Sequence, residues 1–269
     1  MTRCAVILAA GMGTRMRETQ DGAVLEPAQE AAAGAGFKAM MPVGRPFVDY
    51  LLSALADAGI ERACLVVGPG AEEVRSHFAD LAGRRVRVEL AEQARPRGTA
   101  DAVLAAERCA AGEPFLVVNG DNLYPASVLG RLAALAEPAA VGFSRTALVA
   151  DGGIPAARIG RFALLEADGE GFLRRIVEKP SAESLRSFGP DARVSMNCWR
   201  FDSRIFAACR AVPPSPRGEL ELPLAVEHAI AAGAFRVRLL PADEPVLDLS
   251  SRLDVASVTA RLRGVTPRP

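Results

Sequence analysis

The stretch Cys4–Met16, CAVILAAGMGTRM, is the segment that most clearly indicates the fold of the chain. The apolar segment Cys4–Ala10 predicts a buried strand, and it runs into the glycine turn 11–13, then Thr14 and Arg15. A glycine turn after a strand of a parallel sheet lets the backbone approach a ligand at the carboxyl edge, where its N–H groups attract anions. Arg15 adds a permanent charge whose geometry suits phosphate oxygens. We therefore expect a phosphate-binding turn here.

Two common phosphate-binding turns do not fit this stretch. A Walker loop needs the pattern G-x-x-x-x-G-K-[ST], which the chain lacks. A dinucleotide fingerprint needs a third glycine where Met16 stands, and no acidic residue follows the second predicted strand in the expected place. The remaining explanations are another class of nucleotide turn, or a structural turn with a surface arginine.

Composition limits the general class of the protein. The 269 residues are 50% apolar, and 32 basic residues balance 32 acidic ones. Zero net charge gives no general attraction to nucleic acid or to anionic membranes, so any phosphate binding must be local. The five cysteines are odd in number and lack C-x-x-C spacing, which favours reduced thiols. Without a signal segment or a bilayer-length apolar run, we expect a soluble, cytoplasmic protein with no membrane partner.

Strand-like and helix-like segments alternate in the first half of the chain. Such alternation predicts βαβ units, and hence an α/β fold with a Rossmann-like, doubly wound, mixed but mostly parallel sheet. The predicted strands are Cys4–Ala10, Arg62–Val67, Arg85–Leu90 and Phe115–Asn119, and the predicted helices are Pro46–Ala58, Ala71–Leu81 and Thr99–Ala111.

The second half has shorter connections, which suggest strands that extend the same sheet. Its predicted strands are Arg161–Glu166, Leu173–Glu178, Val194–Phe201, Phe235–Leu240 and Val246–Leu249, and its predicted helices are Ser203–Ala211, Leu220–Ala232 and Leu253–Leu262. Two Ala/Gly- or Pro-rich segments, Gln29–Gly36 and Val212–Gly218, are expected to be mobile.

Further segments place polar residues at strand ends and turns. They are FKAMMPV at 37–43, QARPRGTADA at 93–102, VVNGD at 117–121, IGRF at 159–162, VEKP at 177–180, SMNCWRF at 195–201 and VLD at 246–248. A carboxylate such as Asp121, at a strand end beside a phosphate turn, suits Mg²⁺, which prefers one or two carboxylates with phosphates and water. Thr99 can also cap a helix, and Trp199 is expected in the core.

In this order, the segments resemble the motifs of the sugar-1-phosphate nucleotidyltransferases. The resemblance runs from residue 4 to about 255 and starts with LAAGMGTRM, which resembles the family signature L-A-A-G-x-G-T-R-[LM] at every position. The chain departs from the family at Ile159, where the family has Tyr, and at Asn197 and Trp199. The segment between Arg15 and Lys38 is also longer than the family usually has, and we call Glu18–Gly36 the insert.

The resemblance implies roles for individual residues. It implies one domain, 1–262, with a nucleotide-binding lobe at about 1–145 and a sugar-phosphate lobe at about 146–262. Arg15, Lys38 and Lys179 would be catalytic, and Asp121 and Asp248 would hold Mg²⁺. The nucleotide would be bound by Leu8, Ala9, Ala10, Gly11, Gly13, Thr14, Arg15, Gln93, Gly98, Thr99 and Gly120, and the sugar phosphate by Gly160, Glu178, Lys179 and Asn197.

The reaction implied is NTP plus sugar 1-phosphate giving NDP-sugar and pyrophosphate. One alternative is a nucleotidyltransferase that uses a cyclitol, polyol or other phosphate as the acceptor. Another is a non-catalytic nucleotide- and sugar-binding regulatory subunit of the same fold. The identity of the NTP and of the sugar stays open at this point, and so does assembly into a homo-oligomer.

Overall fold

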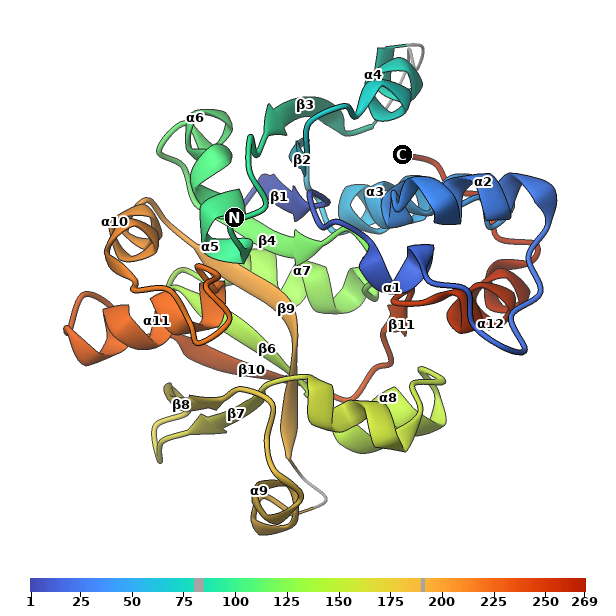
Figure 1. Ribbon diagram of the computed structural model, residues 1–269. Helices are drawn as coiled ribbons and strands as arrows, with labels where there is room; N and C mark the ends of the chain where they lie inside the picture. Colours follow the sequence, from blue (N-terminus) through green and yellow to red (C-terminus); the bar gives the residue numbers. More distant parts are fainter. Residues whose placement is uncertain (80–84, 190–191) are drawn as a thin grey trace.

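A nine-stranded sheet runs through the centre of the computed structural model, which describes residues 1–79, 85–189 and 192–269 (Figure 1). The strands of the molecule are β1 (Cys4–Leu8), β2 (Arg62–Val67), β3 (Arg87–Glu92), β4 (Phe115–Asn119), β5 (Asn122–Leu123), β6 (Ala139–Ser144), β7 (Leu164–Ala167), β8 (Leu173–Val177), β9 (Arg193–Phe201), β10 (Arg238–Ala242) and β11 (Leu247–Asp248). In the nine-stranded sheet the strand order is β10-β6-β9-β4-β1-β2-β3, with β7 beside β9 and β8 beside β7. Strands β5 and β11 form a separate two-stranded sheet.

The first half of the chain builds a parallel sheet, and the second half extends it with antiparallel strands. Strand β1 pairs in parallel with β2 and β4, and β2 pairs in parallel with β3. Strand β9 runs antiparallel to β4, β6 and β7, and β10 is parallel to β6. This mixed, largely parallel sheet with helices confirms the predicted fold class.

Helices cover both faces of the sheet. They are α1 (Thr14–Arg17), α2 (Pro27–Ala35), α3 (Phe47–Asp57), α4 (Glu72–Ala79), α5 (Thr99–Ala105), α6 (Glu107–Ala110), α7 (Ala126–Ala134), α8 (Arg145–Ala150), α9 (Ala182–Ser187), α10 (Arg204–Ala211), α11 (Leu222–Ala231) and α12 (Arg252–Leu262), with 3-10 turns η1 (Lys38–Met40) and η2 (Ala156–Arg161). None of the helices in the described part of the chain has the length and apolar character needed to cross a bilayer.

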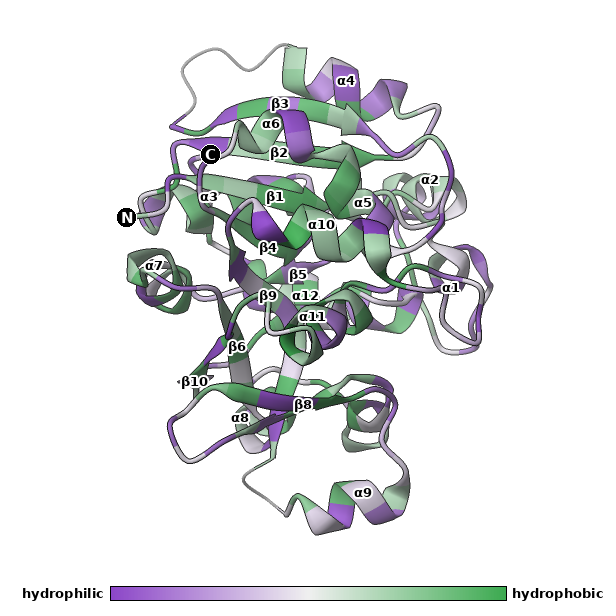
Figure 2. Cartoon of the chain, turned by 90° about the vertical axis from the view of Figure 1, so that its left-hand side faces the viewer, coloured by the Kyte–Doolittle hydropathy of each residue, from purple (hydrophilic) through white to green (hydrophobic). Residues whose placement is uncertain are grey.

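Two apolar clusters on opposite faces of the sheet explain why the central strands are apolar throughout. Alternate residues of β1 point to opposite faces, so that Ala5 and Ile7 pack with α3 and α7, while Cys4 and Val6 pack with α5, α10 and α11. Figure 2 shows β1 and β4 mostly in the green of apolar residues. A third cluster joins α2 and α12 to Met16 at the end of the opening turn.

The structure corrects several boundaries. The segment Gln29–Gly36 is not an irregular mobile stretch, because α2 occupies most of it, with a capping box between Glu26 and Gln29 at its start. The predicted strand at Arg161–Glu166 begins later, as β7, after the 3-10 turn η2. The predicted helix Thr99–Ala111 divides at Ala106 into α5 and α6.

Other differences concern omissions and one element end. Helix α7 and strand β6 are additional elements that the sequence analysis did not predict. The predicted helix Ala71–Leu81 is α4, and the last two residues of that prediction, 80 and 81, lie outside the described residues. The segment Val212–Gly218 connects α10 to α11 without helix or strand.

Candidate active site

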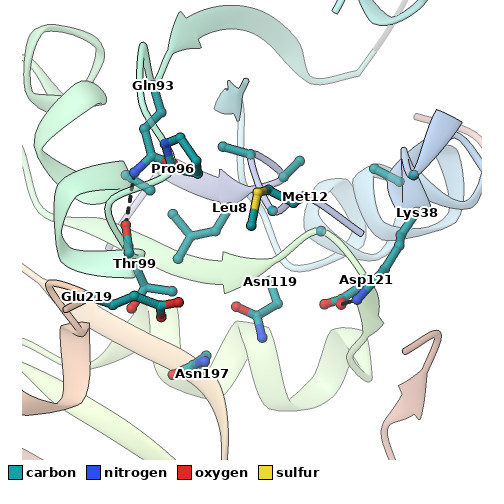
Figure 3. Close-up of a pocket in the computed structure, with 18 residues that line it drawn as sticks. Leu8, Met12, Lys38, Gln93, Pro96, Thr99, Asn119, Asp121, Asn197 and Glu219 are labelled. Atoms are coloured by element: carbon teal, nitrogen blue, oxygen red, sulfur yellow. Dashed lines mark hydrogen bonds and ion pairs between the residues drawn. The ribbon is translucent and has the colours of Figure 1, made fainter. Parts of the chain in front are cut away.

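A cavity of about 280 Å³ lies at the carboxyl ends of β1 and β4 (Figure 3). This is the edge of an open α/β sheet where ligands bind. The lining residues are Leu8, Ala9, Ala10, Gly11, Met12, Gly36, Lys38, Ala39, Gln93, Pro96, Gly98, Thr99, Ala102, Asn119, Gly120, Asp121, Asn197 and Glu219. The structure therefore brings most of the predicted nucleotide-binding residues together with Lys38, Asp121 and Asn197.

Three of the predicted nucleotide-binding residues, Gly13, Thr14 and Arg15, do not line the cavity. Gly13 has a left-handed backbone (φ 62°) and packs against Gly36, while Thr14 and Arg15 begin the short helix α1 and are exposed. Arg15 makes no hydrogen bond or ion pair with any described residue. Its long side chain is therefore available to an anion that approaches the turn.

Gln93 presents an acceptor to the cavity. Its side chain is buried, and its Nε2 donates to the carbonyl oxygen of Gly98 at 3.0 Å and to Oδ2 of Asp101 at 2.8 Å. Since both partners are acceptors, the amide orientation is determined, and Oε1 is the atom left for a ligand. That oxygen suits a ligand edge that carries an N–H donor.

The loop Pro96–Thr99 is held against the segment 219–222. The Thr99 hydroxyl accepts a hydrogen bond from Leu222 N at 2.8 Å, and Ala100 N donates to Leu220 O at 2.8 Å. Gly98 (φ 116°) sits so close to Leu220 that a Cβ atom there would meet its backbone. The helix-capping role expected for Thr99 is wrong, because Gly98 is the N-cap of α5 and the Thr99 hydroxyl serves Leu222 instead.

This contact also brings Glu219 to the cavity, a residue that the sequence analysis missed. In Figure 3 Glu219 lies beside Thr99, with Asn197 nearby. The signal available in the sequence was weak, because a single glutamate in a Pro-rich loop is typical of a solvated surface.

Lys38 and Asp121 face each other across the cavity mouth. Nζ of Lys38 lies 2.8 Å from Oδ2 of Asp121, and both side chains are mostly shielded from solvent. Asp121 follows β4, and Lys38 begins η1, whose N–H bonds back to the carbonyl oxygen of Gly36. A shielded lysine and carboxylate that line the same cavity can exchange their mutual contact for an anionic ligand and a cation.

Asp248 lies directly behind Asp121, in the small β5–β11 pair. Leu249 N donates to Asp121 O at 2.8 Å, and Oδ1 of Asp248 accepts from Asn122 Nδ2 and Ser250 Oγ, both at 2.9 Å. Burial, and secondly the negative charge of Asp121, raises the pKa of Asp248 to about 6. The negative charges of Asp121 and Asp248 therefore lie close to each other.

The carboxylate pair fits a hard divalent cation. Oδ2 of Asp248 is buried and accepts no hydrogen bond within the described residues, although Nη2 of Arg158 lies 3.0 Å away as an ion-pair partner. No group of three or more His, Cys, Asp or Glu residues able to hold a metal occurs in the described ranges. Two carboxylates completed by phosphate oxygens and water match the way Mg²⁺ is usually held, so the residues fit that ion.

Arg158 is a second residue that the sequence did not single out. Its guanidinium pairs with Asp248 and also donates from Nη1 to both carboxylate oxygens of Asp254 at 2.8 Å. Asp254 in turn accepts from the backbone N–H groups of Ser250 and Ser251 at the start of α12. Arg158 thereby fixes Asp248 relative to the last helix.

The predicted sugar-phosphate residues are only partly gathered at the cavity. Asn197 lines it, whereas Gly160, Glu178 and Lys179 do not. Lys179 (φ 43°) and Asn197 (φ 51°) both have left-handed backbones, which non-glycine residues seldom adopt outside constrained sites. Burial, and secondly the charge of Glu221, raises the pKa of Glu178. Gly160 lies in η2, beside Leu185 of α9.

Trp199 is confirmed as a core residue. It is fully buried, and its ring stacks on Phe201 with the ring centroids 5.7 Å apart. Its Nε1 donates to Oδ1 of Asn197 at 3.3 Å, which leaves the amide nitrogen of Asn197 for the cavity. The tryptophan thus supports the site without entering it.

Comparisons with known proteins show the family and the fold of this chain. The model of the nucleotidyl transferase family matches residues 33–245. A glucose-1-phosphate thymidylyltransferase of Streptomyces antibioticus is 32% identical over 86% of this chain and 58% of its own length. A UTP–glucose-1-phosphate uridylyltransferase of Haloferax volcanii is 30% identical over 85% of this chain and 84% of its own length.

The chain belongs to the nucleotidyl transferase family. A solved UDP-glucose pyrophosphorylase structure, complexed with UDP-glucose, has the same fold, with a TM-score of 0.76, 18% identity and coverage of 98% of this chain and 99% of the other. The chain spans little more than half the length of the thymidylyltransferase. The family match begins within α2 and ends before Asp248, so the opening turn and Asp248 lie outside it.

Proposed function

We propose that this enzyme transfers a nucleoside monophosphate from an NTP to a sugar 1-phosphate, releasing pyrophosphate and an NDP-sugar. The observation that carries the proposal is the pairing of Lys38 with Asp121 in a glycine-lined cavity at the carboxyl ends of β1 and β4, with the carboxylate of Asp248 buried close to Asp121. Neither alternative acceptors nor a non-catalytic role has support among the relatives reported above.

The chemistry needs position and charge rather than a base. An oxygen of the sugar phosphate attacks the α-phosphorus, the bond to the β-phosphate oxygen breaks, and pyrophosphate leaves with the electron pair. The attacking phosphate is already ionised at neutral pH, so catalysis depends on holding two anions in line and offsetting their repulsion. The backbone of turn 11–13 and Arg15 would hold the triphosphate, Lys38 the α-phosphate, and Lys179 the sugar phosphate.

Asp121 and Asp248 would hold Mg²⁺ in this proposal. When bound, the ion supplies positive charge to phosphate oxygens. Lys38, the partner of Asp121 in the free protein, would contact the α-phosphate. Arg158 would keep the Asp248 carboxylate in place throughout, because it remains tied to Asp254.

The donor proposed is UTP or dTTP, and the acceptor glucose 1-phosphate. Oε1 of Gln93 is an acceptor, and uracil and thymine present an N3–H donor where cytosine has an acceptor nitrogen. The relatives named above act on glucose 1-phosphate with thymidylyl or uridylyl donors, which supports the same substrates here.

A pyrophosphate-release screen tests the proposal. The purified protein is mixed with Mg²⁺, each of UTP, dTTP, ATP, GTP and CTP, and each of a panel of sugar 1-phosphates. We expect turnover with UTP or dTTP and glucose 1-phosphate, and little with CTP. Absence of pyrophosphate with every pair would exclude the function, and turnover with ATP or CTP alone would exclude the proposed role of Gln93.

A further inference from the structure

Helix α2 lies between the glycine turn and the last helix, and the proposed reaction assigns it no part. It belongs to the insert, yet it is an ordered element with buried Ala32 and Ala33 packed near Met16. In Figure 1 α1, α2 and α12 gather on the same side of the molecule. The insert therefore has two structured neighbours, the short helix α1 and the last helix α12.

The C-terminal end of α2 meets the glycine turn through backbone atoms. Gly36 closes α2 in a left-handed conformation (φ 79°), and a Cβ atom on it would lie 2.8 Å from Met12 O and 2.6 Å from Arg17 Nε. Arg17 also donates from Nη2 to Ala35 O at 2.9 Å. Because no side chain separates Gly36 from Gly13, the end of α2 packs directly on the backbone of the turn.

The same glycine determines where Lys38 starts. Lys38 N donates to Gly36 O at 3.1 Å, and Gly36 itself lines the cavity. The proposed phosphate site has two cationic parts, the turn with Arg15 and the segment with Lys38. Both contact the backbone of Gly36.

The middle of α2 is tied to α12 by a buried arginine. Arg252 donates from Nη1 to both carboxylate oxygens of Glu30, at 2.7 and 2.6 Å, and from Nε to Met16 O at 2.8 Å. Arg252 is 7% exposed, so this guanidinium joins α12, α2 and the end of α1 in one shielded contact.

We infer that α2 is a positioning element for the phosphate-binding turn, and that the Arg252–Glu30 pair and the Gly36–Gly13 contact are what fix it. This inference rests on the proposed function for its kinetic consequence. The structural part, that α2 holds the turn in place, stands on the free protein alone.

Hydrogen–deuterium exchange of the free protein tests the structural part. Glu30 is exposed on its outer side, so Glu30→Gln keeps the fold and weakens only the pair. We expect exchange in residues 8–17 to become about three- to tenfold faster, the range expected for losing a partly exposed ion pair. Unchanged exchange in 8–17, whether or not α2 itself exchanges faster, would overturn the inference.

A glycine pair on the insert supplies matched variants. Gly36→Ala places a methyl group against Met12 and Arg17 in a left-handed conformation, and should increase exchange in the turn further. Gly34→Ala, in the same helix, meets nothing within 4 Å and should leave the turn unchanged or slow its exchange. Equal effects of these two substitutions on residues 8–17 would contradict the inference.

Kinetics test the consequence for the site. With UTP or dTTP as the varied substrate, Glu30→Gln should raise the nucleotide KM about three- to tenfold, with kcat and the KM for glucose 1-phosphate within about twofold. A variant that merely folds less well would lose kcat at unchanged KM, and that result would count against a positioning role. If the wild-type protein turns over neither nucleotide, the proposed function fails while the exchange experiment still decides the role of α2.

Discussion

At the scale of single residues, the site is a balance of fixed charges around two carboxylates. Asp121 pairs with Lys38 and Asp248 pairs with Arg158, so each carboxylate of the proposed metal site has a cationic partner in the ligand-free protein. The two cations differ in how they are held. Arg158 has a second carboxylate partner in Asp254, whereas Lys38 has Asp121 alone within the described residues.

Replacing Asp121 tests the proposed metal site. Asp121→Asn should lower kcat on the order of 100-fold or more, because one of two carboxylates for the divalent ion is lost. Stability should change by no more than about 1–2 kcal/mol, since Lys38 and Asp121 line the cavity, where water can reach the ammonium group that loses its partner. Steady-state kinetics and urea unfolding measure the two effects, and near-normal turnover in this variant would refute the assignment.

The ionised carboxylate of Asp248 should lower the free energy of unfolding of the metal-free protein at neutral pH. Its pKa rises from 3.8 to about 6 on folding, so the folded chain binds this proton more tightly than the unfolded chain. The tighter proton binding of folded Asp248 therefore contributes fully to the free energy of unfolding below about pH 4. This stabilising contribution is lost as the pH rises through about 6. Asp248→Asn should raise the free energy of unfolding by about 1–3 kcal/mol at pH 7.5, with little change at pH 4.

Urea unfolding in the presence of a chelator measures this effect at both pH values. Asp254→Asn is the matched control, because Asp254 caps α12 and its loss should destabilise the protein. If Asp248→Asn instead destabilises the protein at pH 7.5, the stabilising interactions of the ionised carboxylate exceed the free-energy cost of burying its charge.

At the scale of elements, backbone contacts between distant segments shape the cavity. The loop Pro96–Thr99 docks on Leu220 and Leu222, and the turn at Gly13 docks on Gly36. Neither contact has a periodic sequence signature, because a glycine in a loop is equally typical of an unconstrained turn. The sequence therefore indicated the glycines but not their partners.

Gly98 provides a test of such a contact. Gly98→Ala combines a positive φ with a collision against Leu220, and it should destabilise the protein by about 2–4 kcal/mol. Gly112→Ala also has a positive φ (77°) but meets nothing within 4 Å, so its cost should be about 1 kcal/mol. Chemical unfolding of both variants isolates the collision, and equal losses would mean that Leu220 moves away easily.

Helix α7 shows why some elements escaped prediction. Its buried residues Val128, Leu129, Leu132 and Ala133 have helical spacing, but the helix has only nine residues and contains Gly130, which has a low helix propensity. Helix α2 escaped for a different reason. Its Ala/Gly composition resembles a flexible linker, and the packing against α12 that orders it involves residues more than 200 positions away.

At the scale of the whole molecule, β9 joins the two halves of the chain. It pairs with β4 of the first half and with β6 and β7 of the second, and Tyr124 donates to Met196 O at 2.6 Å across the same region. A sheet that is continuous across both halves cannot lose one half without exposing the edge of the other.

We therefore expect unfolding to be a single cooperative transition. Trp199, the one tryptophan of the sequence, lies on β9, so its fluorescence reports the junction of the halves. Fluorescence and far-ultraviolet circular dichroism should give the same urea midpoint. Separate midpoints would reveal two independently unfolding parts.

Local pattern was enough to predict the α/β class, the glycine turn and Asp121 at a strand end, because strand periodicity and turn chemistry are properties of neighbouring residues. The resemblance to family motifs added the candidate residues Lys38, Gln93 and Asp248. Tertiary structure alone decided that Glu219 lines the cavity, that Arg158 holds Asp248, and that α2 supports the turn. Each of these depends on segments far apart in the chain. Their contacts arise from the packing of the sheet and helices, which no short stretch of sequence encodes.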